Sequence, residues 1–92
     1  MPPAQTSDEP TLDAALEPVL RRMERVRLRR EFVRELLRKG DVLDPNEVAL
    51  RWAGMPNKHE RALTSEVFFA LAEWGFLAPR ADGRYRVVRA TD

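Results

Sequence analysis

The side chains that could support catalysis or bind a metal ion are few and scattered in this chain. His59 is the only histidine, there is no cysteine, and the two aspartates closest in sequence are Asp41 and Asp44. Catalysis or zinc binding needs several such groups within reach of one another, and Asp44 is already explained as a helix cap. The four glycines are dispersed, so no glycine-rich phosphate loop is present. We therefore expect no enzyme, no cofactor and no metal site.

Arginine supplies most of the positive charge, and it is unevenly placed. The net charge is only +1, with fourteen arginines against two lysines. Residues 1–20 carry four acids and no base, whereas residues 21–40 carry nine bases and three acids. Attraction to a polyanion is therefore expected locally and not over the whole surface. We expect most of this basic run to be a solvated helix surface, with a contact to phosphate or to an acidic protein as the alternative.

The length and composition predict one small globular domain. Ninety-two residues allow a single hydrophobic core, and no apolar run approaches the roughly 20 residues that span a bilayer. We expect a cytoplasmic protein without membrane contact. The preference for arginine over lysine and the absence of isoleucine are typical of a GC-rich bacterial or phage genome. Residues 1–10, with three prolines and no apolar periodicity, are predicted to be a disordered tail.

Apolar spacing predicts one long helix over residues 18–39, ended by Gly40. Its start is expected near Glu17, with Pro18 in the first turn, in preference to a separate short turn over residues 12–16. The predicted helix is about twice the usual length for the first helix of a small domain. The second half has a broad apolar face, suited to a compact three-helix core.

The first half of this helix has apolar residues at three-four spacing, like a short coiled-coil seam. A second copy of the chain is the simplest partner for that stripe, so we expect a homodimer. Residues 11–30 then form a helical extension, and residues 31–92 form the domain proper. The residues expected at the dimer seam are Leu16, Val19, Leu20, Met23 and Val26.

The second half of the chain has strong local signals. Asp44 followed by Pro45 is a typical helix start and predicts a helix over residues 45–53. A turn over residues 54–57 leads to a third helix that runs to residue 74. Trp52 and Trp74 are expected to pack in or between the helices. Two short strands then flank Asp82-Gly83, which is typical of a two-residue hairpin loop, and Val42-Leu43 is expected to add a short strand.

Residues 31–90 resemble a winged helix-turn-helix domain of the bacterial and phage type. The resemblance rests on ALRWAG at residues 49–54, ALAEWGFL at residues 70–77 and RADGRYRVV at residues 80–88. It implies a mostly α fold with a small β-hairpin, in which a three-helix core carries a wing and the long N-terminal helix precedes it. One departure is a turn about four residues longer than usual before the third helix.

In this family the third helix enters the major groove of double-stranded DNA. Asn can read adenine and Arg or Lys can read guanine, whereas Ser and Thr more often hold phosphates. The alternative interpretation is a structural one, with Asn57 as the helix cap, Glu60 as its capping-box partner and the other residues solvated. The residues that the resemblance assigns to DNA binding on this helix are Asn57, Lys58, His59, Arg61, Thr64 and Ser65.

The hairpin is rich in arginine, and the resemblance makes it the wing. Arg80 or Arg84 could then contact a minor groove or a phosphate, unless these charges only protect an exposed sheet edge from aggregation. The expected function is a DNA-binding transcriptional regulator or a phage or mobile-element accessory factor. The alternative is a winged helix that binds a protein partner and does not contact DNA.

Overall fold

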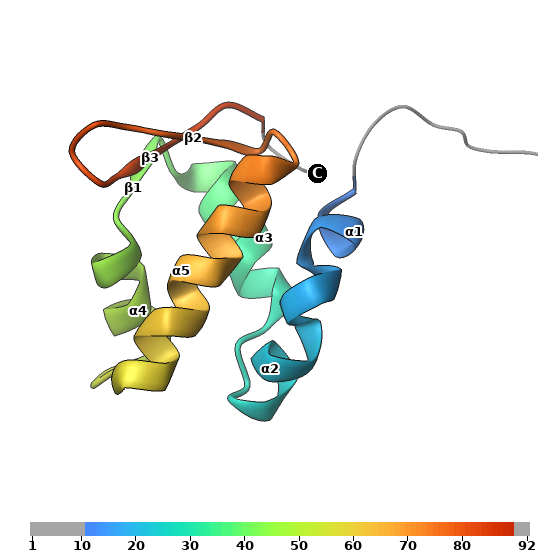
Figure 1. Ribbon diagram of the computed structural model, residues 1–92, viewed down its shortest axis with the longest axis vertical. Helices are drawn as coiled ribbons and strands as arrows, with labels where there is room; N and C mark the ends of the chain where they lie inside the picture. Colours follow the sequence, from blue (N-terminus) through green and yellow to red (C-terminus); the bar gives the residue numbers. More distant parts are fainter. Residues whose placement is uncertain (1–10, 90–92) are drawn as a thin grey trace, which may run out of the picture.

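The computed structural model describes residues 11–89, and the predicted disordered tail lies outside them. Within this range the chain is mostly helical, with a small antiparallel sheet in the strand order β1-β3-β2. Figure 1 shows α5 at the centre, with α4 on one side, α1 and α2 on the other, and α3 behind. The elements are α1 (Leu12–Leu16), the 3-10 helix η1 (Glu17–Val19), α2 (Leu20–Arg25), α3 (Arg30–Lys39), β1 (Val42–Leu43), α4 (Pro45–Ala53), α5 (Lys58–Glu73), β2 (Leu77–Pro79) and β3 (Tyr85–Val87).

The N-terminal segment starts earlier than expected. Thr11 caps α1, because its Oγ1 accepts a hydrogen bond of 3.1 Å from the N–H of Ala14. Pro18 lies in the first turn of η1, where the missing N–H costs little. The prediction of a helix that starts near Glu17 is therefore wrong, and the alternative with a separate turn over residues 12–16 is the one observed.

The predicted continuous helix over residues 18–39 is also wrong, because the chain breaks between Arg25 and Arg30. The break centres on Arg27, whose φ of 64° lies in the left-handed region. A non-glycine residue in this region costs roughly 1–2 kcal/mol. The sequence around the break contains neither glycine nor proline, so no local signal indicated it.

Two hydrogen bonds close this turn. The N–H of Leu28 donates to the carbonyl of Met23 at 2.8 Å, and the N–H of Arg27 donates to the carbonyl of Glu24 at 3.2 Å. These are the two bonds of a Schellman motif, which normally has glycine at the left-handed position. Leu28 and Met23 are both buried. Burial of a leucine side chain stabilises by about 1.5–3 kcal/mol, which is enough to offset the strain at Arg27.

The break changes the role of the expected dimer seam. Leu16, Val19 and Met23 are buried in the core of the same chain, and Leu20 is half-buried against it. Val26 is the only one of the five that is exposed. These side chains cannot form a seam between two copies while this core is intact, so the stripe needs no second copy to cover it. One buried cluster spans residues 12–77, and the expected boundary near residue 30 divides it.

The second half of the chain follows the sequence-based expectation closely. Asp44 caps α4 by accepting a hydrogen bond of 2.9 Å from the N–H of Asn46. β1 pairs with β3, as expected for Val42-Leu43, and β2 pairs with β3 on its other side. One burial expectation fails, because Trp74 is exposed.

The predicted two-residue hairpin loop is longer than expected. The N–H of Arg80 donates to the carbonyl of Arg84 at 2.8 Å, and the N–H of Gly83 donates to the carbonyl of Arg80 at 3.2 Å. The loop therefore has three residues, Ala81, Asp82 and Gly83. Gly83 has a φ of 87°, which matches a type I turn that ends in a left-handed glycine.

Candidate nucleic-acid interface

The first turn of α5 is built by a capping box. The Oδ1 of Asn57 accepts a hydrogen bond of 2.8 Å from the N–H of Glu60, and the Oε1 of Glu60 accepts one of 2.8 Å from the N–H of Asn57. The structural interpretation of Asn57 is thereby confirmed. A bidentate hydrogen-bond contact with adenine needs both the side-chain oxygen and the side-chain NH2 group of an asparagine. Asn57 could supply both only by giving up the cap.

Four of the expected residues lie exposed on the N-terminal half of α5: Lys58, His59, Arg61 and Ser65. The two acids of this region are both engaged. Glu60 belongs to the capping box, and Glu66 forms an ion pair with Arg22 of α2. The hydrogen bonds from Arg22 lower the pKa of the Glu66 carboxyl and raise the pKa of Arg22. The surface that remains available carries positive charge and hydrogen-bond donors.

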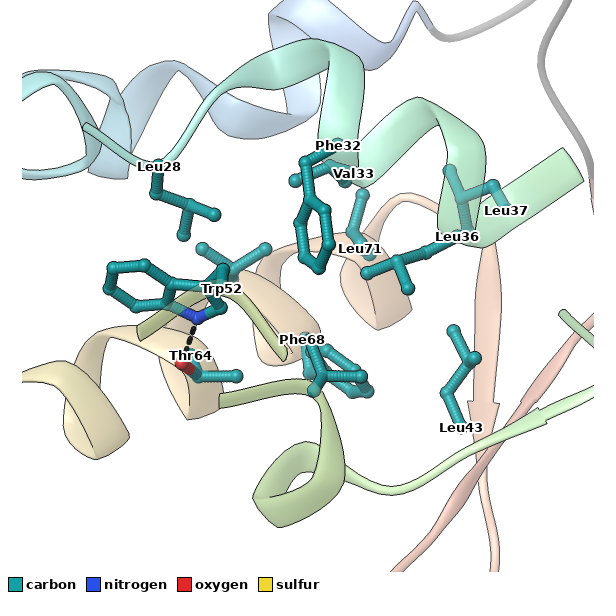
Figure 2. Close-up of a pocket in the computed structure, with 12 residues that line it drawn as sticks. Leu28, Phe32, Val33, Leu36, Leu37, Leu43, Trp52, Thr64, Phe68 and Leu71 are labelled. Carbon is teal, nitrogen blue, oxygen red and sulfur yellow. Dashed lines mark hydrogen bonds between the residues drawn. The ribbon is translucent and has the colours of Figure 1, made fainter. Parts of the chain in front are cut away.

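Thr64 does not belong to this surface. Its side chain is buried, with 2% exposure, and lies between α4 and α5. The Nε1–H of Trp52 donates to the Oγ1 of Thr64 at 3.0 Å (Figure 2). That hydroxyl donates in turn to the carbonyl of Glu60 at 2.8 Å. The assignment of Thr64 to DNA binding is therefore wrong, because a buried hydroxyl that ties two helices together cannot reach a phosphate.

Replacement of Thr64 tests this structural role. Thr64→Val keeps the approximate shape and removes the acceptor of the Trp52 N–H, so we expect a loss of about 1–3 kcal/mol in the free energy of unfolding. Ser65→Ala, next along the helix and exposed, should stay within about 0.5 kcal/mol of the parent. Urea denaturation followed by Trp fluorescence measures both. Equal stability of the two variants would contradict the assignment.

Arg80 and Arg84 lie on the hairpin and are each close to an acid. Arg80 pairs with Asp82 at 3.3 Å, and the Nε of Arg84 lies 3.8 Å from a carboxylate oxygen of Asp44. Asp82 also accepts a hydrogen bond of 3.0 Å from the N–H of Arg84, which is the main cause of its lowered pKa. Part of the positive charge of the hairpin is therefore balanced within the chain.

The structure separates the expected residues into two groups. Arg84 contacts Asp44, the cap at the N-terminal end of α4, whereas the turn to α5 leaves from its C-terminal end. α4 has nine residues, which corresponds to a length of about 13 Å. The hairpin arginines and the N-terminal residues of α5 are thus at opposite ends of α4. A ligand that contacts both groups must extend along this helix.

Two shallow grooves border the N-terminal half of α5, each of about 290 Å³. One lies towards α4, with Leu50 and Arg61 in its lining. The other lies towards α2 and brings Arg22 and Arg25 beside His59. Sequence reasoning did not place Arg22 or Arg25 near the third helix. The contact joins residues 44 positions apart in the pair Arg22–Glu66, and no sequence motif marks it.

The space enclosed between α3, α4 and α5 is part of the core. Its volume is about 10 Å³, at the lower limit for one water molecule, and its lining is almost entirely apolar (Figure 2). It is therefore no ligand site. Over residues 11–89, no group of three or more His, Asp or Glu side chains is arranged to hold a metal ion. None of the helices in that range is long and apolar enough to cross a membrane.

The N-terminal half of α5 thus offers an exposed, basic, donor-rich surface flanked by two grooves. No protein-family model, no curated protein and no solved structure matches this chain.

Proposed function

We propose that this chain is a winged-helix protein that binds double-stranded DNA, acting as a transcriptional regulator or an accessory factor. The order of elements supports the fold assignment. A helix, a short strand, two helices joined by a turn and a two-stranded hairpin follow one another, and the first strand joins the hairpin in the sheet order β1-β3-β2. In this arrangement α4 and α5 form the helix-turn-helix, and the β2–β3 hairpin is the wing.

The observation that carries the proposal is the surface of α5. Lys58, Arg61 and Ser65 are exposed on its N-terminal half, while Glu60 and Glu66 are held by other partners. The N-terminal end of a helix also has a partial positive charge, which favours an anion. Cationic side chains at this end suit phosphates and the acceptor-rich edge of guanine.

One observation favours a protein partner as the second candidate. Leu50, Met55 and Phe69 are exposed on α4, on the following turn and on α5, with Met55 at 92%. Exposed apolar side chains mark a protein interaction surface when they form a contiguous patch, and this candidate requires these three to do so. This candidate predicts that Phe69 is needed for the partner and that the basic residues of α5 are not.

A salt series with duplex DNA separates the two candidates. Neutralisation of several phosphates makes affinity fall steeply with salt, with a slope of about 0.9 per phosphate in a logarithmic plot. We expect Lys58→Ala combined with Arg61→Ala to lower affinity about a hundredfold, since each of the two charged hydrogen bonds contributes on the order of 1.5 kcal/mol and about 1.4 kcal/mol corresponds to a factor of ten. Fluorescence anisotropy with a labelled random duplex measures this.

A matched control keeps the charge change the same. Arg38→Ala combined with Lys39→Ala removes two positive charges at the C-terminal end of α3, where both residues pair with Glu35. This control should retain most of the affinity. Absence of binding by the parent protein at low salt would exclude the DNA proposal, and equal losses in both double variants would exclude the α5 site.

A further inference from the structure

Four exposed arginines surround the break between α2 and α3, and we call them the arginine corner: Arg21, Arg25, Arg27 and Arg29. Over residues 11–89, none of the four forms an ion pair with a carboxylate. Two neighbours behave differently, because Arg22 pairs with Glu66 and Arg30 pairs with Asp13 at 3.0 Å. The corner therefore places four guanidinium groups without an ion-pair partner in the described part of the chain, with Glu24 as the one acid among residues 21–29.

One position in the corner has a backbone conformation that favours glycine, yet the residue there is an arginine. Arg27 occupies the left-handed position of the Schellman motif, where glycine would be free of strain. Glycine would avoid the backbone strain at this position, and the side chain of Arg27 is exposed. Strained residues are retained where the side chain has another use. A cation placed at the outermost point of a tight turn suits an interaction with an external anion.

The corner meets the proposed DNA surface at Arg25, which lines a groove beside α5. The groove towards α2 has Arg25 and Val26 on one wall and His59 and Ala62 of α5 on the other. The bottom of Figure 1 shows α2 and the start of α5 at the same end of the molecule. A ligand that covers the N-terminal half of α5 therefore has the corner at its side, at the opposite flank from α4.

We infer that the arginine corner binds the phosphodiester backbone beside the major groove that α5 enters. Guanidinium groups form paired hydrogen bonds with phosphate oxygens, and contacts of this kind position a protein without reading sequence. DNA is favoured over an acidic protein because Arg25 of the corner and His59 of the proposed DNA surface line one groove. This inference rests on the proposed function and adds a second contact region to it.

The test removes three of the four arginines of the corner and leaves α5 unchanged. In the variant Arg21→Ala, Arg25→Ala, Arg29→Ala, we expect the logarithmic salt slope for duplex DNA to fall by about 2.7, from about 0.9 per lost phosphate contact. Affinity should fall by a similar factor for every duplex sequence. A control variant, Arg38→Ala, Lys39→Ala, Arg51→Ala, removes the same charge from the other end of α3 and from α4, and should keep the parent slope.

Arg27→Gly provides an independent measurement. It removes one charge and relaxes the left-handed backbone, so we expect a raised Tm together with a salt slope lower by about 0.9. This variant answers the question even if the triple variant does not fold. If the parent binds DNA normally and the salt slope is unchanged in both Arg27→Gly and the triple variant, the inference about the arginine corner is overturned and the proposed DNA-binding function stands. Equal slopes in the corner and control variants would also overturn that inference, and a parent that does not bind DNA would overturn both proposals.

Discussion

Leu16→Ala is expected to reduce the free energy of unfolding by about 2–5 kcal/mol, whatever the protein concentration. Leu16 has 0% exposure and lies in the cluster that joins the N-terminal helices to α5. Truncation removes buried methyl groups and leaves a cavity that the neighbouring helices cannot fully close. For a small domain with a stability of roughly 5–15 kcal/mol, this is a large fraction of the total. Urea denaturation at two protein concentrations measures the effect.

The concentration series decides between an intramolecular role and a dimer seam. A residue buried in its own chain affects unfolding equally at low and high concentration, whereas a seam residue couples stability to association. Val26→Ala is the matched control, because Val26 is 36% exposed and should cost less than about 0.5 kcal/mol. If Leu16→Ala proved neutral, or if the midpoint of the parent rose with concentration, the N-terminal helices would not be folded onto α5 as described.

The second half of the chain was predictable because its signals are local. Asp44 before Pro45, and Asn57 three residues before Glu60, satisfy the free N–H groups of a helix with side chains a few positions away. Gly54 and Gly83 take the positive φ that a helix end and a hairpin require. Such features depend on neighbours in sequence, so they can be recognised before the fold is known.

The first half was not predictable, because its geometry depends on distant contacts. No glycine or proline marks the break at Arg27, and helical spacing placed Val26 inside and gave Leu28 no role. The left-handed turn moves the chain off that helical phase, so that Leu28 is buried and Val26 is exposed. The packing of the N-terminal helices against α5 offsets the strain of this turn. The apolar periodicity of residues 18–39 contains no information about α5, so it could not predict the break.

The candidate site likewise combines features set by sequence neighbours with features set by distant contacts. That the N-terminal half of α5 is rich in donors could be read from the sequence. Which of them face solvent depends on the packing of α4, and this packing buries Thr64 while it leaves Ser65 exposed. The proximity of Arg22 to Glu66 depends on how α2 is folded back, so the positive flank of α5 emerged only from the structure.

Adjacent phenylalanines on α5 should respond in opposite ways to truncation. Phe68→Ala is expected to cost about 3–5 kcal/mol, because its ring is fully buried and meets Tyr85 of β3 edge-on, with ring centroids 5.2 Å apart at 75°. The variant should lose much of its cooperative unfolding transition in urea. Tyr85 lies in β3, which pairs with both β1 and β2. Loss of the Phe68 ring should therefore also weaken the packing of the hairpin against α5.

Phe69→Ala is the matched control, one residue along the same helix and 63% exposed. We expect its stability to stay within about 0.5 kcal/mol of the parent. Equal losses in the two variants would contradict the helical phase of α5, on which every surface assignment depends. The same variant then separates the candidate functions: unchanged affinity for duplex DNA is expected if the basic N-terminal half of α5 makes the contacts. Loss of a protein partner with intact stability would instead support an apolar interaction surface centred on this side chain.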